Sequence, residues 1–269
     1  MKPLITLTLM LASLALQAQS ILNVLRLNEE MDYQTRRPRS IRLTEITYNS
    51  SGKTTRTAVK LFDEAGMVIM EDRYDNEGNV AAKLSYRNDT LRRLILSSSF
   101  ERLYSWGATL EESTYSYDQN NCLVSMVTRD INGSVLLHLT FTCNEKGYPA
   151  EMTPVNVQGM SYGKETATYD YENNRVYTSF ISTKGKVLSS DTGFISLTKR
   201  TDSLNLDKHG KVIKSFRRLQ DGTTVEYEYE YSYDKYGNCL EERAYVISST
   251  ANGKPKRKLS RVLRREYSY

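Results

Sequence analysis

The stretch Tyr231-Ser232-Tyr233-Asp234-Lys235-Tyr236-Gly237-Asn238 reads as the end of a β-strand followed by a tight turn. Alternating aromatic residues are typical of a half-buried strand. Asp caps a turn through its own side chain, and Gly adopts the left-handed conformation that strains other residues. A second clear copy is Tyr74-Asp75-Asn76-Glu77-Gly78-Asn79. Looser copies end at Gly52, Gly66, Gly133, Gly147, Gly185, Gly210 and Gly222. This self-similarity indicates a chain of repeated β-hairpins.

Strand patterns separated by these turns occupy most of the chain after residue 40. Leu137-His138-Leu139-Thr140-Phe141 alternates in the same way as the tyrosine-rich strand. The sequence therefore predicts an all-β fold, a long antiparallel meander of repeated β-hairpins that forms an open twisted sheet or an incomplete barrel.

Two stretches interrupt the hairpin pattern. Residues 19–39 form an N-terminal lead segment with an apolar cluster, which suits either a short helix or a leading strand. Residues 149–165 contain Pro149, Pro154, Gly159 and Gly163 and show little periodicity, so we expect a long connection there. It would divide the repeats into a first block at 40–148 and a second block at 166–269.

The first eighteen residues have the pattern of a secretory signal peptide. Lys2 supplies a positive charge, residues 4–16 are an apolar run, and cleavage after Ala18 would expose Gln19. The run is short of the roughly 20 residues that a spanning helix needs, although an uncleaved anchor is the alternative. We expect export to the periplasm, the outer-membrane surface or the extracellular space, with no transmembrane span in the mature chain.

The two clear copies of the turn phrase resemble the YD repeat of the Rhs family. That repeat has Tyr-Asp, two variable residues, Gly, then Asn or Arg and an apolar residue, as in Tyr233-Asp234-Lys235-Tyr236-Gly237-Asn238-Cys239. The resemblance extends over most of 46–240 in degenerate form, with Asn121 in the Gly position after Asp118. It implies hairpin architecture and a bacterial envelope or secreted setting, and it transfers no activity.

The three cysteines are an odd number for an exported chain. Cys122 and Cys143 flank the predicted hairpin turn at Asp130-Ile131-Asn132-Gly133. With Asp130 opposite Ser134, Cys122 lies one residue out of register with Cys143, and a β-bulge would bring the two together. A disulfide and buried free thiols are the two interpretations.

Residues suited to catalysis are few. His138 lies on a predicted strand and His209 in a turn, and neither has a nearby partner at metal or triad spacing. We expect a protein that is not an enzyme and has no cofactor and no metal ion, although a hydrolase with distant carboxylates stays open. The formal net charge of +5, with both signs intermixed, does not predict nucleic-acid binding.

Tyrosine is over-represented, and four copies alternate along one predicted strand: Tyr227, Tyr229, Tyr231 and Tyr233. The intervening positions hold Glu226, Glu228 and Glu230. An exposed tyrosine row is a possible ligand platform for sugar rings or a peptide, whereas a buried row would pack the sheet. The carboxylates belong in water, so burial of the tyrosine face is favoured.

A basic cluster near the C-terminus is a possible patch for an anionic polymer: Lys254, Lys256, Arg257, Lys258, Arg261, Arg264 and Arg265. A solvated strand edge explains the same residues. The sequence thus favours a non-enzymatic binding or scaffold role in the envelope, with an envelope glycan or another envelope protein as candidate partner. A carbohydrate- or peptide-binding module, a lipid-carrier half-barrel and a hydrolase are the alternatives.

Overall fold

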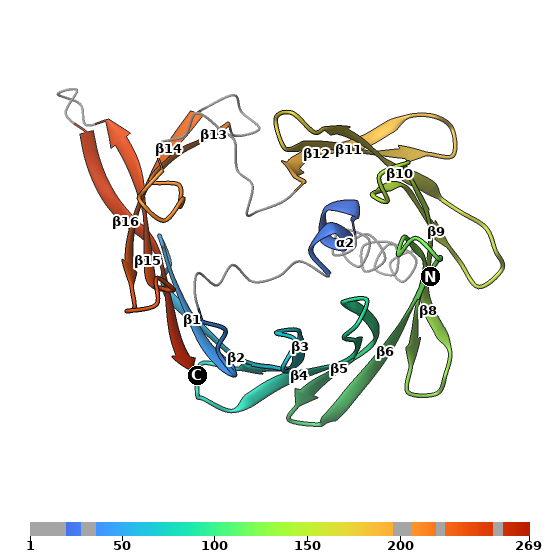
Figure 1. The fold of residues 1–269 in the computed structure, drawn as a ribbon, viewed down its shortest axis with the longest axis horizontal. Coiled ribbons are helices and arrows are strands. Elements are labelled where there is room, and N and C mark those ends of the chain that lie inside the picture. Colours follow the sequence, from blue (N-terminus) through green and yellow to red (C-terminus); the bar gives the residue numbers. More distant parts are fainter. Residues whose placement is uncertain (1–19, 28–35, 196–205, 219–223, 250–254) are drawn as a thin grey trace, which may run out of the picture. The chain divides into compact units, whose positions relative to one another are not determined.

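The computed structural model describes residues 20–27, 36–195, 206–218, 224–249 and 255–269. These residues form one short helix, α2 (Ile21–Leu27), and sixteen β-strands (Figure 1). The strands are β1 (Ser40–Asn49), β2 (Gly52–Phe62), β3 (Val68–Tyr74), β4 (Val80–Asp89), β5 (Leu94–Tyr104), β6 (Gly107–Tyr117), β7 (Leu123–Asp130), β8 (Val135–Cys143), β9 (Pro149–Val155), β10 (Gly163–Asp170), β11 (Arg175–Ser182), β12 (Val187–Phe194), β13 (Lys214–Arg218), β14 (Thr224–Tyr233), β15 (Cys239–Ser249) and β16 (Pro255–Ser268). The predicted signal peptide, residues 1–18, lies outside the described residues.

The strands form one antiparallel sheet in the order β12-β11-β10-β9-β8-β7-β6-β5-β4-β3-β2-β1-β16-β15-β14-β13. Strands consecutive in the chain are neighbours, except for β12 and β13, and β1 also pairs with β16, with Ser40 opposite Ser268. The order ends at β12 on one side and at β13 on the other, so the described sheet is open. The predicted all-β meander of hairpins is confirmed.

The chain divides into two compact units that do not follow the predicted sequence blocks. Unit 1 comprises Met1–Glu30, Tyr86–Ser99 and Thr109–Thr201, and unit 2 comprises Met31–Ser85, Phe100–Ala108 and Asp202–Tyr269. Pairing of β1 with β16 is the physical reason, because it brings the start of the first block and the end of the second into unit 2. A boundary read along the sequence does not anticipate this pairing.

One turn geometry recurs nine times among the described residues. The N–H of the first residue donates to the carbonyl four residues on, and the N–H of the fourth donates back to the carbonyl of the first. The first residues are Asp63, Asp75, Asp118, Asp130, Asn144, Asn156, Ser182, Asp207 and Asp234. The fourth residue is Gly with φ between 76° and 89° in eight turns, and Asn121 with φ 66° in the other. The turn phrase in the sequence corresponds to this left-handed position.

Helix α2 contributes to the core of unit 1. Ser20 begins the helix, where its hydroxyl and its carbonyl accept the N–H groups of Asn23 and Val24. Ile21 is fully buried and packs with residues of β7, β8 and β9: Leu123, Met126, Leu139, Phe141 and Met152. Of the two structures expected for the N-terminal lead segment, Ile21–Leu27 adopt the helix, whereas residues 36–39, also described, are not helical.

Residues 149–165 are not the connection that the sequence predicts. They contain β9, the turn that begins at Asn156 and the start of β10. The two prolines are tolerated because the β9–β10 ladder is short, with register pairs only at Met152↔Glu165 and Glu151↔Thr166. A strand whose ladder is short on one side can hold residues that lack an N–H donor.

Candidate functional site

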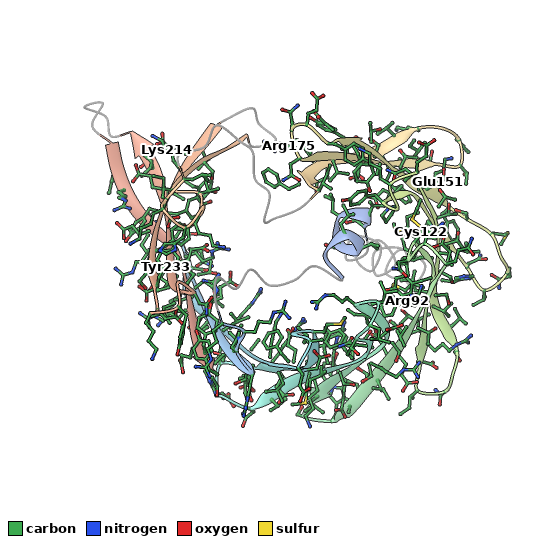
Figure 2. All side chains as sticks on the ribbon, in the orientation of Figure 1. Arg92, Cys122, Glu151, Arg175, Lys214 and Tyr233 are labelled. Atoms are coloured by element: carbon green, nitrogen blue, oxygen red, sulfur yellow. A yellow bond between two sulfur atoms is a disulfide. The ribbon has the colours of Figure 1, made fainter. Side chains whose placement is uncertain are left out.

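The predicted tyrosine row lies on β14, with each of its four side chains half-buried. The hydroxyl of Tyr229 lies 3.1 Å from the hydroxyl of Ser215, and that of Tyr231 donates to the carbonyl of Val212 at 2.8 Å. The hydroxyl of Tyr233 donates to Asp207. Neighbouring rings of the row contact each other, with Tyr229 and Tyr231 stacked at 6.4 Å between centroids. Figure 2 shows Tyr233 among the side chains of this part of the sheet.

The contacts of this row repeat a general pattern, which we call the tyrosine clamp. Two tyrosines lie two positions apart at the end of a strand or just beyond it. The hydroxyl of the first donates to a carbonyl two residues after the left-handed glycine of an earlier turn, and the hydroxyl of the second bonds the side chain that begins that turn. The clamps are Tyr231 and Tyr233 on the Asp207 turn, Tyr267 and Tyr269 on the Asp234 turn, and Tyr169 and Tyr171 on the Asn144 turn.

A related contact occurs where the turn lacks glycine. Tyr117 donates to the carbonyl of Ile95 at 3.0 Å, two residues after Arg93, which has φ 56°. The side chain of Arg92 then reaches the next turn, donating to Asn121 Oδ1 at 2.7 Å and to the Asp118 carbonyl at 3.0 Å. The first contact of a clamp can therefore form beside a left-handed residue other than glycine.

Clamping changes the acidity of the groups involved. Burial raises the pKa of Tyr233, and the hydrogen bond to Asp207 raises it further. Burial also raises the pKa values of Tyr169 and Tyr267. Burial raises the pKa of Asp207 too, but hydrogen bonds from Tyr233 and from two N–H groups of its own turn outweigh that effect and leave it below its usual value. The clamps on the Asp207 and Asp234 turns thus favour a neutral tyrosine and an ionised carboxylate, whereas the clamp on the Asn144 turn holds an amide.

The clamp on the Asp234 turn also holds the end of the N-terminal lead segment. The guanidinium of Arg36 donates to the hydroxyl of Tyr236 at 2.9 Å and lies 5.1 Å from the ring centroid of Tyr269. Asn238 is almost fully buried and donates to the Arg36 carbonyl at 3.2 Å and to the Tyr269 hydroxyl at 2.8 Å. The copy of the turn phrase at Asp234–Asn238 therefore anchors Arg36, which lies shortly before the start of β1.

The basic cluster lies on β16, apart from Lys254, which is outside the described residues. All four of its arginines are ion-paired: Arg257 with Glu228 and Glu230, Arg261 with Glu45 and Glu242, Arg264 with Glu241, and Arg265 with Glu242. Arg257 also lies 3.7 Å from the ring centroid of Tyr245. Lys256 and Lys258 are exposed. The arginines thus cross-link β16 to β1, β14 and β15, although each exposed pair adds little stability.

Cys122 and Cys143 are joined by a disulfide with their Cα atoms 6.2 Å apart (Figure 2). The register of β7 on β8 shifts between Thr128 and Arg129. On the turn side of this bulge Arg129 pairs with Val135, and on the other side Thr128 pairs with Leu137, one residue further along β8 than it would without the bulge. Extending that second register to residue 122 sets Cys122 opposite Cys143. The third cysteine, Cys239, is a buried thiol that accepts a hydrogen bond from Arg265.

The two histidines are held by neighbouring residues. His138 Nε2 lies 3.3 Å from the Ser125 hydroxyl, and the His209 ring lies 3.9 Å from that of Tyr233. Within the described ranges, no three His, Cys, Asp or Glu side chains are grouped as a metal ion requires. Nor does any helix in the part that the structure describes have the length and apolarity to cross a membrane.

Glu165 is a buried charge that the sequence does not single out. Its carboxylate accepts the N–H of Ile21 at 2.7 Å, across 144 residues of sequence. Burial raises the pKa of this group, and hydrogen bonds from Ile21 and Thr178 oppose that rise only in part. The contact fixes the beginning of α2 on the β10 strand. No local pattern marks Glu165, since its partner is a backbone group at the other end of the unit's chain.

No family model matches this chain, and no curated protein matches it. Among solved structures it is similar to a porin-like protein from Bacteroides uniformis ATCC 8492, at 14% identity over 89% of this chain and 100% of that one, with a TM-score of 0.46. A second similar structure is TcdB2-TccC3-TEV, at 14% identity over 78% of this chain and 14% of that one, with a TM-score of 0.32. What the chain does is therefore argued from its own residues.

Proposed function

We propose that the chain is an exported, non-enzymatic protein of the bacterial envelope, whose hairpin sheet serves as a scaffold or a binding surface. One observation carries the scaffold role: in the tyrosine row, the hydroxyls of Tyr231 and Tyr233 bond the protein's own Val212 carbonyl and Asp207 carboxylate. The hydroxyl of Tyr231 donates its proton to the Val212 carbonyl, so it has no second proton for a ligand. The ion pairs of β16 support the same role, since they use its arginines to join strands.

Export is supported by two features of the residues. The first eighteen have the charge and apolar pattern of a secretory signal. Cys122 and Cys143 form a disulfide, and such bonds persist in oxidising compartments such as the periplasm. The degenerate YD-like turn phrase fits this setting by resemblance.

The experiment is production of the full chain in a Gram-negative bacterium, followed by fractionation and N-terminal sequencing. We expect the protein outside the cytoplasm, beginning at Gln19 or within a few residues of it. A variant with Leu9→Arg and Leu11→Arg in the apolar run should stay in the cytoplasm with Met1 intact and serves as the control. An intact Met1 on the unaltered chain, with the protein in the cytoplasm, would contradict the proposal.

A second candidate function is carbohydrate or peptide binding, favoured by an aromatic pair outside the tyrosine row. Tyr104 and Trp106 stack with centroids 4.8 Å apart, and Trp106 is 74% exposed. Exposed stacked aromatics suit the apolar face of a sugar ring or a peptide side chain. A glycan array with the mature protein tests it: Trp106→Ala should abolish any signal, while Tyr177→Ala, at another exposed tyrosine, should leave the signal intact.

A further inference from the structure

The two ends of the strands in unit 1 differ in character. Successive turns of an antiparallel meander alternate between the two ends, so the β7–β8, β9–β10 and β11–β12 turns share one end. At or beside these turns lie seven apolar side chains that are each 54% to 72% exposed: Ile131, Leu136, Val157, Met160, Tyr162, Val187 and Leu188. We call this set the apolar rim.

The opposite end of the same strands is polar. This end holds the β6–β7, β8–β9 and β10–β11 turns. The exposed side chains of these turns include Gln119, Asn120, Glu145, Lys146, Glu172 and Asn173. The one large ring exposed there, that of Tyr171, lies 3.5 Å from the Lys146 ammonium and is bonded to Asn144. Across β7 to β12 the exposed apolar side chains thus gather at one end, although both ends share the turn geometry; Leu91, which is 95% exposed in the β4–β5 turn, lies singly at the other end.

The two ends of these strands also differ in the charge of their exposed side chains. The turns of the apolar rim carry Lys184 and Lys186, and the carboxylate of Asp130 is engaged by the N–H groups of Asn132 and Ser134. The polar end carries Glu145 and Glu172 at exposed positions, with Lys146 as its exposed cation. Exposed apolar side chains beside cations match the chemistry of an anionic bilayer surface, where apolar groups enter the acyl boundary and cations meet lipid phosphates.

We propose that the apolar rim docks unit 1 on an anionic bilayer surface. The apolar side chains stand on separate turns and form no single groove, which suits shallow insertion at several points. Lys184 and Lys186 would lie at the level of the lipid phosphates, while the acidic polar end faces water. This inference stands on the residues of unit 1 and does not depend on export.

The test is co-sedimentation of the mature full-length chain with vesicles of phosphatidylethanolamine and phosphatidylglycerol, and with vesicles of phosphatidylcholine alone. We expect binding to the anionic vesicles that weakens as salt is raised. The triple variant Ile131→Ser, Val157→Ser and Met160→Ser should lower the partition coefficient by about tenfold or more. Lys184→Glu with Lys186→Glu should weaken binding to anionic vesicles alone.

The matched control is the triple variant Gln119→Ser, Glu145→Ser and Asn173→Ser at the polar end, which should bind as the unaltered chain does. Urea unfolding of every variant separates lost binding from lost folding. Failure of the unaltered chain to bind anionic vesicles would overturn the proposal, as would unchanged binding by a folded apolar-rim variant. A change in oligomeric state caused by that variant without vesicles would assign the rim to self-association and overturn it too.

Discussion

The hydroxyl of Tyr233 donates a hydrogen bond to Oδ2 of Asp207, a residue 26 positions earlier in the chain. The other oxygen, Oδ1, accepts the N–H groups of His209 and Lys211 at 2.8 and 2.9 Å. A single carboxylate thus shapes its own turn and holds a strand from the following hairpin. Local turn formation and packing between hairpins are coupled through Asp207; Asp234 repeats the arrangement, and Asn144 makes the equivalent contacts with an amide.

Removing a clamp hydroxyl should destabilise the protein without removing the ring. Tyr231→Phe or Tyr233→Phe should each lower the free energy of unfolding by about 1–3 kcal/mol, because a carbonyl or a carboxylate loses its donor. Tyr231→Ala should cost roughly 2–4 kcal/mol, since ring packing is also lost. Urea unfolding measures both, with Tyr177→Phe, at a side chain 47% exposed, as the unaffected control. Equal midpoints for all these variants would show that the clamps are not stabilising.

Where glycine holds the left-handed position of the repeated turn, an added alanine side chain should destabilise the protein. Gly133 has φ 80°, and a Cβ built there meets no atom within 4 Å. Gly133→Ala should therefore lower the free energy of unfolding by about 1–2 kcal/mol through backbone strain alone. Asn132→Ala, one residue earlier in the same turn, should change it by less than about 0.5 kcal/mol. The two are compared by urea unfolding, and a larger loss for Asn132→Ala would reverse the argument.

Reduction of the Cys122–Cys143 disulfide should destabilise the chain. The bond closes a loop with a sequence separation of 21, for which chain entropy predicts a contribution of about 3 kcal/mol. Urea unfolding with and without a reductant measures the difference. A chain carrying Cys122→Ser and Cys143→Ser should start at the reduced stability and show no response to the reductant. A response in that variant would place the effect on Cys239 instead.

Alkaline pH should unfold the protein through its clamped tyrosines. The pKa values of Tyr169, Tyr233 and Tyr267 lie above the ordinary 10.0 in the folded state. Their stabilising contribution is fully present below about pH 10 and falls as pH rises toward the folded pKa values, because the unfolded tyrosines ionise first. Urea midpoints measured from about pH 9 to about pH 11 should decline, and Tyr169→Phe should reduce the slope. An equal slope in that variant would exclude Tyr169 from the effect.

Glu165 should act in the opposite part of the pH range. Its pKa is raised above 4.5 in the folded state, so its contribution is full below about pH 4.5 and is lost as pH rises through the folded pKa. Glu165→Gln keeps an acceptor for the Ile21 N–H and carries no charge. It should therefore flatten the dependence of unfolding free energy on pH between about 4.5 and 7.

The matched variant Glu165→Ala removes the acceptor instead. It should cost about 1–3 kcal/mol at neutral pH, since the buried N–H of Ile21 is left without this partner. Urea unfolding of both variants across the same pH series distinguishes charge from hydrogen bonding. Identical behaviour of the two variants would mean that the carboxylate does not hold α2.

The turns could be predicted from the sequence because each is encoded by residues close together. Asp234 and Gly237 define theirs within four positions, and alternation around them marks the strands. The partner of Tyr233 is 26 residues away, so the clamp has no local signature. The role of Glu165 and the pairing of β1 with β16 could not be predicted for the same reason, because each joins residues that lie far apart in the sequence.

The apolar rim was missed for a different reason. Ile131 and Val157 occupy turn positions where most residues are tolerated, so their side chains carry no signal about strands. Only the alternation of turns between the two ends shows that the apolar ones lie together. The one-residue offset between Cys122 and Cys143 is likewise removed by the bulge at Arg129. The sequence is compatible with a bulge there but contains no residue pattern that predicts it.

Pairing of β1 with β16 also determines when, during synthesis of the chain, the two edges of β1 can become paired. When β1 leaves the ribosome, β2 follows at once and covers one of its edges, but the other edge stays open until β16 has been synthesised. Until then the backbone N–H and C=O groups on that edge of β1 are open to strands from other chains. Completion of unit 2 thus depends on the synthesis of β16, and a chain truncated before Pro255 would keep an unpaired edge on β1.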